Sequence, residues 1–196
     1  MTILMLKSKT IAFPAIAEMQ SIGDGEPAYG CRLAIDPKDP QVAEIEAAMK
    51  EAAVAKWKDS GAEVLAFLNS EKKTAFERGP ARNKKTGKVY DGFEGMFTLG
   101  ARNAKTQPTV FDQFGKEVHD KREIERLIYS GAKVNAKVEF WAQDNTFGRR
   151  VNCSLLGVMF AGEGERFGGG SAPASADDFA GMAQTPQYPD DGSDLS

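Results

Sequence analysis

The stretch that most constrains the fold runs from Tyr129 to Gly162, because it has the pattern of two long strands joined by a short polar turn. Every second side chain is apolar in each half: Val134, Ala136, Val138 and Phe140 in the first, then Val151, Cys153 and Leu155 in the second. This period is that of strands with one buried face. Residues 143–149 contain Asp, Asn and Gly, which are typical of a hairpin loop. The stretch therefore predicts a long antiparallel hairpin.

The opposite face of this predicted hairpin combines an indole with basic and amide side chains. It carries Lys133, Asn135, Lys137, Glu139 and Trp141 on the first strand and Arg150, Asn152 and Ser154 on the second. The loop adds Phe147 and Arg149. An exposed aromatic ring lets a base stack, and cations bind phosphates, so this face predicts nucleic-acid binding. The alternative is an ordinary two-faced hairpin whose Trp141 caps a core.

Composition limits the class of protein. A chain of 196 residues with 41% hydrophobic residues can bury one core, so we expect one domain, residues 1–165. Residues 166–196 predict a flexible Gly-rich linker and an acidic disordered tail. Two Cys and one His are too few for a structural zinc site, and we expect no metal and no cofactor. The few thiols, and the lack of a signal peptide or a long apolar run, predict a cytoplasmic protein with no membrane partner.

The charges are divided between two parts of the chain. The formal net charge is -3, but residues 171–196 contain five Asp and no Lys or Arg, which leaves +2 for the remainder. Between Lys72 and Lys105 there are nine cationic residues and three acidic ones, a local excess of six positive charges. Phe76 and Tyr90 lie within this basic run. Such an asymmetry is typical of a chain with a basic surface for an anionic ligand and a separate acidic tail.

The remaining periodicity orders the other elements. Alternation predicts strands over residues 7–13, 29–35, 93–102 and 108–113. A helix is expected to begin at Asp39 and Pro40, to bury a stripe that includes Trp57, and to end at Gly61; a second spans residues 120–129 behind an Asp cap. Residues 62–68 fit either a strand or a helix. A later stretch, residues 70–92, predicts a long, mobile, basic loop.

This order predicts a mainly β chain with an OB-fold, a five-stranded barrel. A helical and basic-loop insertion is expected between the first two strands, and a disordered tail is expected to follow the barrel. In such a barrel, oligonucleotides bind to the middle strands and to the loops that join the first strand to the second and the fourth to the fifth. The basic run falls in the first of these loops, and Phe147 and Arg149 fall in the second. The fold and the charges thus both favour nucleic acid as the ligand.

Three segments resemble one protein family. They are YSGAKVNAKVEFWAQDN followed by GRRVNCSLLGVMFAGEGERFGGG, the strand segment ARNAKTQPTVFDQ, and GEPAYGCRLAI near the start. The chain resembles the phage single-stranded DNA-binding proteins of the OB-fold type over most of residues 25–170. The resemblance implies sequence-independent coating of single strands during DNA replication, recombination and repair, without catalysis. It also implies an acidic tail that recruits replication proteins, although this chain ends in DDGSDLS rather than in an aromatic residue.

These patterns define two sets of candidate site residues. The nucleic-acid set is Trp141, Lys137, Lys133, Asn135, Arg102, Lys105, Phe111, Tyr90, Arg82, Lys84, Lys85, Lys88, Phe147, Arg149 and Arg150. The partner-binding set in the tail is Asp177, Asp178, Phe179, Tyr188, Asp190, Asp191 and Asp194.

Three competing interpretations stay open at the level of sequence. The first is a structural or protein-interaction OB module, and the second is a binder of duplex DNA or RNA, since phosphate contacts and stacking carry little information on strandedness or sugar. The third is catalysis by Asp59, Glu71 and Lys73, which have a nuclease-like spacing. Such a short pattern arises often by chance, and we expect no catalytic residues.

Overall fold

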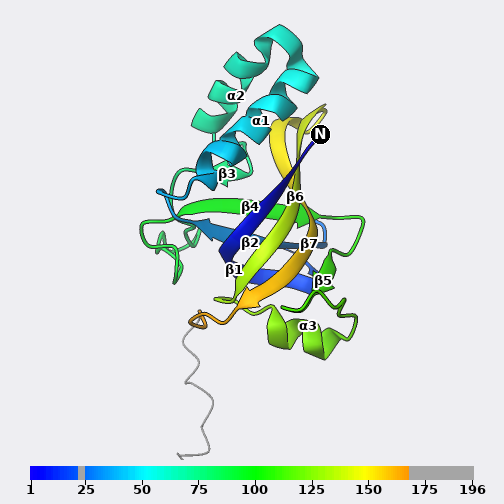
Figure 1. Cartoon of the computed structure of the whole chain (residues 1–196). Coiled ribbons are helices and arrows are strands. Elements are labelled where there is room, and N and C mark those ends of the chain that lie inside the picture. Colours follow the sequence, from blue (N-terminus) through cyan, green and yellow to red (C-terminus); the bar gives the residue numbers. More distant parts are fainter. Residues whose placement is uncertain (22–24, 168–196) are drawn as a thin grey trace, which may run out of the picture.

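Figure 1 shows the computed structural model of the chain, which describes residues 1–21 and 25–167. The strands are β1 (Thr2–Gln20), β2 (Ala28–Ile35), β3 (Phe76–Glu77), β4 (Phe97–Asn103), β5 (Thr109–Phe111), β6 (Lys133–Asn145) and β7 (Gly148–Gly162). The helices are α1 (Gln41–Trp57), the short 3-10 helix η1 (Lys58–Ser60), α2 (Gly61–Ser70) and α3 (Lys121–Leu127). None of these helices is long and apolar enough to cross a membrane.

The strands form one seven-stranded open sheet in the order β3-β4-β2-β1-β6-β7-β5. The long strand β1 pairs with β6 through its first half and with β2 through its second, so it joins the two sides of the sheet (Figure 1). At the far edge, β5 pairs with β7 in parallel. The prediction of a mainly β, OB-type domain with a helical insertion is confirmed.

The helices and the basic loop occupy the part of the sequence predicted for the insertion, after residue 35, but two strands precede them instead of one. The sequence placed it between the first two strands of the barrel, but β1 and β2 are successive antiparallel strands, and the helices follow β2 and precede β3. The segments 7–13 and 29–35 look like two parts of one strand in the sequence because each is short and apolar. In the structure they belong to two strands that pair with each other along residues 10–20 and 28–34.

The predicted hairpin is confirmed as β6 and β7, which pair from Lys133 opposite Gly162 to Asn145 opposite Gly148. Side chains alternate along β6 as expected, with Val134, Ala136, Val138 and Phe140 fully buried. Trp141 follows this alternation and lies half-buried on the outer face. Because no bulge occurs between Val138 and Asn145, the indole stays outside the core.

The insertion begins as a pair of helices. Helix α1 buries Ile45, Met49 and Ala53 against the sheet, at the helical spacing that the sequence predicts. It ends at Trp57, because Lys58 takes a positive φ of 54°. Gly61, expected to end α1, instead begins α2, so residues 62–68, which fitted either a strand or a helix, are helical. Glycine is needed at position 61, because a Cβ there would lie 2.7 Å from the Cα of Val54.

The basic loop that follows is held at its beginning by backbone hydrogen bonds. The amide of Ala75 donates to the carbonyl of Val151 on β7 (2.8 Å), and the carbonyl of Ala75 accepts from Gly100 on β4 (2.9 Å). Phe76 is buried and packs edge-on against Phe97, with ring centroids 5.8 Å apart. Residues 71–77, expected to belong to a mobile loop, therefore connect β4 to β7.

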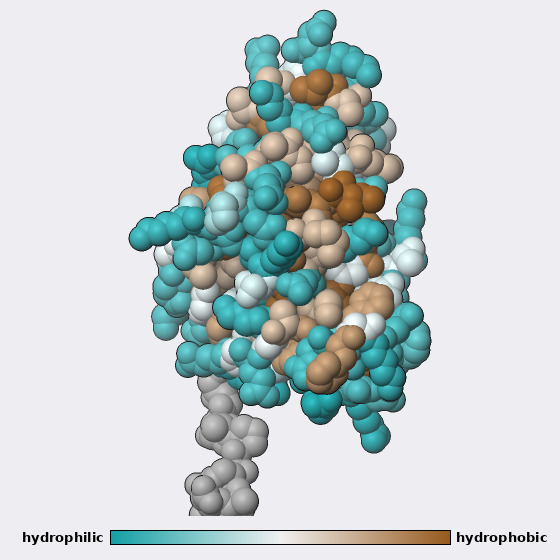
Figure 2. All heavy atoms as spheres, in the orientation of Figure 1, coloured by the Kyte–Doolittle hydropathy of each residue, from teal (hydrophilic) through white to brown (hydrophobic). Residues whose placement is uncertain are grey.

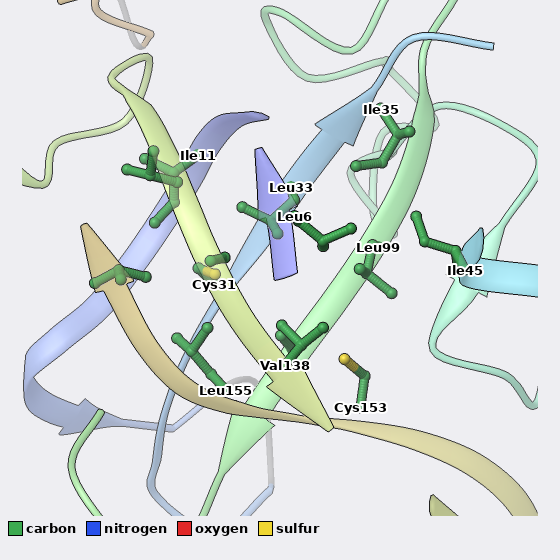
Figure 3. Close-up of a cluster of buried hydrophobic side chains, with 14 of the residues drawn as sticks. Leu6, Ile11, Cys31, Leu33, Ile35, Ile45, Leu99, Val138, Cys153 and Leu155 are labelled. Atoms are coloured by element: carbon green, nitrogen blue, oxygen red, sulfur yellow. The ribbon is translucent and has the colours of Figure 1, made fainter. Parts of the chain in front are cut away.

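Figure 3 shows the main core, in which side chains from β1, β2, β4, β6 and β7 meet, among them Leu6, Leu33, Leu99, Val138 and Leu155. The two thiols, Cys31 and Cys153, are free and buried in it. Burial raises the pKa of Cys31 to about 12, so this thiol stays protonated near neutral pH.

A second, smaller cluster lies on the other face of β2. It consists of Ala12, Ala34, Ala81 and Phe93, with Tyr90 and Phe167 packed against it. Sequence alternation assigned Phe93 to a strand, but β4 begins only at Phe97, and Phe93 is a buried turn residue beside it. This cluster fixes the basic loop on the outer face of β2.

Candidate nucleic-acid interface

The outer face of β2 and β4 is built from glycine and arginine. Gly30 lies opposite Arg102, and Arg32 lies opposite Gly100, so the two residue types alternate on both strands. The intervening Cys31 and the facing Ala101 point into the core. A Cβ on Gly30 would lie 2.6 Å from the carbonyl oxygen of Ala101, so this position requires glycine. The result is a sheet surface that is open at its centre and flanked by guanidinium groups.

A bulge in β1 places an aromatic ring beside this surface. The register of β1 against β2 shifts between Ala12 and Ala15, and Phe13 within the shift has a φ of 50°. A positive φ is unfavourable for a bulky residue, and bulges re-aim side chains. The hydroxyl Oγ of Ser130 accepts the amide of Phe13 (3.0 Å), and the ring of Phe13 is 47% exposed. The backbone thus holds a costly conformation that presents Phe13 to solvent.

Tyr90 and Arg32 complete an aromatic and cationic cluster with Phe13. The rings of Phe13 and Tyr90 meet edge-to-face, with centroids 4.7 Å apart. The guanidinium of Arg32 lies 5.9 Å from each centroid, within the range of a cation–π interaction. Together with Gly30 and Arg102 they line a hollow of about 530 Å³. We call Phe13 and Tyr90 the aromatic pair.

A second hollow, of about 1160 Å³, continues from the first, since Arg32 and Gly100 line both. It lies between α1, α2 and the basic loop. Its cationic side chains are Lys50, Lys72, Arg78, Arg82 and Lys84, against Glu46 and Glu77. Arg78 pairs with Glu46, with Nε 2.6 Å from Oε1, whereas the other four cations make no ion pair within residues 1–21 and 25–167. The two hollows together are called the outer groove below.

The predicted residues on the face of β6 are largely engaged by the protein. The Nε1 of Trp141 donates to Ser154 Oγ (2.9 Å). The Oδ1 of Asn135 accepts the amide of Ser8 (2.9 Å) at a second bulge of β1. The ammonium of Lys133 donates to the hydroxyl of Thr10, also on β1. Lys137 is exposed. This face therefore offers fewer free polar groups than the sequence suggests.

Figure 2, drawn in the orientation of Figure 1, shows hydrophobic side chains among the hydrophilic ones on the face that carries the N-terminal half of β1, β6 and β7. Two hydrophobic side chains of β1, Ile3 and Met5, are 55% and 52% exposed, and they lie beside Glu139 and Lys137, with which they pair on β6. The hairpin face is therefore mixed in character rather than basic.

At the tip of the hairpin, one carboxylate holds two groups. Asp144 Oδ2 accepts from Arg149 Nε (3.1 Å) and from Trp57 Nε1 (2.8 Å), which ties the tip to α1. Phe147 is 86% exposed, and Arg150 is exposed beside it. Trp57, expected to pack in the α1 stripe, contacts the core and also forms this hydrogen bond.

The structure separates the predicted nucleic-acid residues into two groups. Tyr90, Arg82, Lys84 and Arg102 line the outer groove; Arg82 donates to the carbonyl of Gly87, and Arg102 to the carbonyl of Glu26. Lys85 and Lys88 are exposed on the same loop. Outside the groove lie the residues of β6, its tip, Lys105 in the turn after β4, and Phe111, half-buried on β5. The tail residues fall outside the described part of the chain.

Sequence reasoning missed Phe13, Gly30, Arg32 and Gly100. The last three were visible in a repeated pattern, because Gly-Cys-Arg at 30–32 and Gly-Ala-Arg at 100–102 both put glycine and arginine on one strand face. Only the pairing of β2 with β4 shows that the two patterns face each other. Phe13 had no signal, since a bulge at a non-glycine residue cannot be read from alternation.

No catalytic cluster stands out in the described residues. Lys73 pairs with Glu71 at 3.6 Å, and both side chains are close to half exposed. Within residues 1–21 and 25–167, no three His, Cys, Asp or Glu side chains are grouped as a metal ion would require.

Comparison with known proteins gives one family and several relatives. The family described as Enterobacter phage Enc34, ssDNA-binding protein, matches residues 2–190. "Putative protein p50" of Acyrthosiphon pisum secondary endosymbiont phage 1 is 32% identical over 181 residues, which cover 90% of this chain and 91% of that protein.

Two solved structures are similar in fold. The single-stranded DNA-binding protein from bacteriophage Enc34, in complex with ssDNA, has a TM-score of 0.69 at 24% identity, over 85% of this chain and 89% of that one. The single-stranded DNA-binding protein gp2.5 of bacteriophage T7 has a TM-score of 0.55 at 18% identity, over 95% and 97% of the two chains. At these identities the likeness is one of fold.

Proposed function

This chain belongs to the family of the Enterobacter phage Enc34 ssDNA-binding protein, and from that membership we propose that it binds single-stranded DNA in the outer groove. Binding is independent of sequence and involves no catalysis. The observation that carries the proposal is the aromatic pair with Arg32, placed over a glycine floor at the end of a basic groove. The related phage Enc34 protein, similar in fold, has been solved with ssDNA.

Each part of the groove has a task in this proposal. Unstacked bases lie against Phe13 and Tyr90, and the absence of side chains at Gly30 and Gly100 lets them approach the sheet. The cations of the second hollow bind successive phosphates. Stacking and charge do not distinguish the four bases, because every base has a π-face and every nucleotide a phosphate. A duplex keeps its bases stacked inside, so it can use the cations but not the aromatic pair.

The wider role follows from the same family membership. We propose that copies of the protein coat and protect single strands during phage DNA replication, recombination and repair in the cytoplasm of the infected cell. The predicted contacts of Trp141, Lys137 and the other hairpin residues stay a prediction. Their engaged polar groups make them secondary to the outer groove in this proposal.

The acidic tail adds regulation to the proposal. Five Asp on a tethered segment compete with phosphate for the groove cations, and DNA displaces them. The freed segment then presents Phe179 and Tyr188, beside Asp residues, to replication or recombination proteins. A truncation that ends at Gly170 should therefore bind single strands more tightly than the full chain, most at low salt. Equal affinities of the two forms at low salt would eliminate the competition.

One assay tests the proposed function. Fluorescence polarisation with a mixed-sequence single strand of about 30 bases, the matching duplex and the matching RNA gives the preference directly. We expect the single-stranded DNA to bind most tightly, and Arg32→Ala to weaken it more than Arg122→Ala, a control on α3 outside the groove. Failure to bind the single strand at low salt would reject the proposal and favour a protein-interaction module. Tighter binding to the duplex or to the RNA would instead identify a binder of duplex DNA or of RNA.

A further inference from the structure

After β7 ends at Gly162, the chain folds back onto the segment that precedes β6. The hydroxyl of Tyr129 accepts the amide of Gly164 and donates to its carbonyl, both at 3.1 Å. The guanidinium of Arg166 lies 3.8 Å from the centroid of the Tyr129 ring, and the amide of Phe167 donates to the carbonyl of Ser130 (3.0 Å). We call residues 163–167 the C-terminal anchor.

Glycines form the seat of this anchor. A Cβ on Gly92 would overlap the ring of Phe167, and one on Gly131 would overlap the carbonyl of Glu165. Both glycines have a positive φ, 79° and 110°. Gly164 in turn lies against the carbonyl of Gly131 so closely that a side chain would not fit. Three glycines from separate parts of the chain thus let the anchor lie directly on the backbone.

The anchor touches the supports of both members of the aromatic pair. The ring of Phe167 packs on the small cluster of Ala12, Ala34, Ala81 and Phe93, against which Tyr90 also packs. On the other side, Ser130 binds the anchor with its carbonyl and Phe13 with its hydroxyl. Phe167 and Tyr90 therefore pack against the same small cluster. The backbone amide of Phe167 also binds Ser130, the residue whose hydroxyl accepts the amide of Phe13 in the strained bulge.

We infer that Phe167 is a positioning residue, which holds Phe13 and Tyr90 in place for stacking on bases. This inference rests on the proposed function, because it concerns the same groove. The groove cations Lys50 and Lys72 lie on α1 and at the beginning of the basic loop, which the backbone hydrogen bonds of Ala75 hold to β7 and β4. The hydrogen bonds of the anchor named above go instead to Tyr129 and Ser130. Loss of Phe167 from its seat should thus impair stacking and leave the phosphate contacts of Lys50 and Lys72 intact.

The test separates stacking from charge. The full chain is titrated with a 30-base oligothymidine and with an abasic deoxyribose-phosphate strand of equal length, across a salt series. For Phe167→Ala, we expect at least a fivefold loss of affinity for oligothymidine, about the lower end of what one lost base stack costs. Affinity for the abasic strand and the salt slope should stay unchanged.

A pair of glycine variants gives the matched control. Gly92→Ala blocks the seat while the anchor keeps its own sequence, and it should reproduce the selective loss of Phe167→Ala. Gly95→Ala imposes similar backbone strain, at a φ of 70°, but faces open space, so its ratio of oligothymidine to abasic affinity should stay that of the wild type. Phe167→Leu keeps apolar packing in the seat and serves as the partial-rescue variant if Phe167→Ala does not fold at the assay temperature.

The outcomes are distinct. A selective loss in Phe167→Ala and Gly92→Ala, with partial rescue by Phe167→Leu, supports the inference. An equal loss for both ligands, or no loss for either, overturns it and leaves Phe167 a structural residue or a bystander. If the wild type itself fails to bind either strand, the proposed function fails. If the wild type binds both strands equally, base stacking is absent and the inference fails while phosphate binding stands.

Discussion

The outer groove and the hairpin face carry the same kinds of residue, but they differ in how many of these residues are free to bind. On the hairpin face, Trp141, Asn135 and Arg149 have hydrogen-bond partners within the protein. In the groove, Arg82 and Arg102 donate to backbone carbonyls. The other groove cations, Arg32, Lys50, Lys72 and Lys84, make no side-chain hydrogen bond or ion pair in the described part of the chain. A group that must give up a partner gains little when it binds a new one. Availability therefore separates the two surfaces more sharply than composition does.

The two bulges of β1 show how the chain produces this difference. Both Ser8 and Phe13 have a positive φ, at 52° and 50°, and a side chain on a neighbouring segment accepts the amide of each. At Ser8 that acceptor is Asn135, so the bulge occupies a polar group of the hairpin face. At Phe13 the acceptor is Ser130, and the bulge turns an aromatic ring toward the groove. Backbone strain of this kind costs about 1 to 3 kcal/mol per site and tends to persist at functional sites.

The largest difference between the two surfaces is expected from charge reversal. Arg32→Glu should weaken single-stranded DNA binding by about 2 to 3 kcal/mol, because a carboxylate then faces the phosphates at the junction of both hollows. Arg150→Glu, the matched reversal on the hairpin, should cost less than about 1 kcal/mol at the same salt, the scale of a rim charge. Polarisation titrations of both variants measure the two losses of affinity. A larger loss in Arg150→Glu than in Arg32→Glu would contradict the assignment of the groove as the main binding surface.

The aromatic residues sharpen the same comparison. Phe13→Gly should weaken binding by about 1 to 3 kcal/mol, the scale of a lost base stack. Since glycine adopts a positive φ without strain, relief of that strain should offset much of the lost contact with Tyr90, and the free energy of unfolding should change by no more than about 1 kcal/mol. Trp141→Ala should show the opposite balance, with a free energy of unfolding lower by about 1 to 2 kcal/mol and little change in affinity. Chemical denaturation and polarisation on both variants provide the readout. A large affinity loss in a stable Trp141→Ala would restore the hairpin face as the main site.

Salt dependence separates the two surfaces at the level of single phosphates. The logarithm of affinity should fall with the logarithm of salt at a slope of roughly -3 to -4, as for four to six contacts. Lys84→Ala should make the slope shallower by about one contact, whereas Lys137→Ala should change it by less than half of that. Titrations between low and moderate salt measure these slopes. Equal changes in the two variants would mean that the strand crosses both surfaces.

The smallest effect is expected at the hairpin tip. Asp144→Asn removes the carboxylate that pairs with Arg149 and accepts from Trp57. The freed guanidinium should raise affinity by no more than about 0.5 kcal/mol, since exposed ion pairs have energies of that order. Isothermal titration against the wild type measures the gain. A gain of tenfold or more would show that the tip lies directly on the DNA path.

Much of the fold could be predicted because its long elements have strong periodicity. The β6–β7 hairpin, α1 and the Asp-capped α3 follow from alternation or helical spacing, and Asp120 does accept the amide of Glu123 (2.9 Å). The division of the first strand into β1 and β2 could not be predicted, since their antiparallel pairing depends on contacts between separate segments. The short β5 lies within the strand predicted over residues 108–113, whereas β3 falls in the segment assigned to the basic loop and forms because β4 offers it an edge.

The candidate site could be predicted only in part, for a related reason. The charge of Arg82, Lys84 and Arg102 is visible in the sequence, and so is the aromatic Tyr90. Whether a side chain is already engaged by another residue is not visible in the sequence, and the hydrogen bond from Trp141 to Ser154 is one such case. Phe13 depends on a bulge whose acceptor, Ser130, lies 117 residues away in the chain.

The most direct test of the outer groove is a map of where a bound base lies. An oligothymidine with single 5-iodouracil substitutions is photocrosslinked to the full chain, and the modified peptides are identified by mass spectrometry. We expect crosslinks at Phe13 and Tyr90, which disappear in excess unlabelled single strand. Crosslinks confined to Trp141 or Phe147 would contradict binding in the groove and would place the bases on the hairpin face.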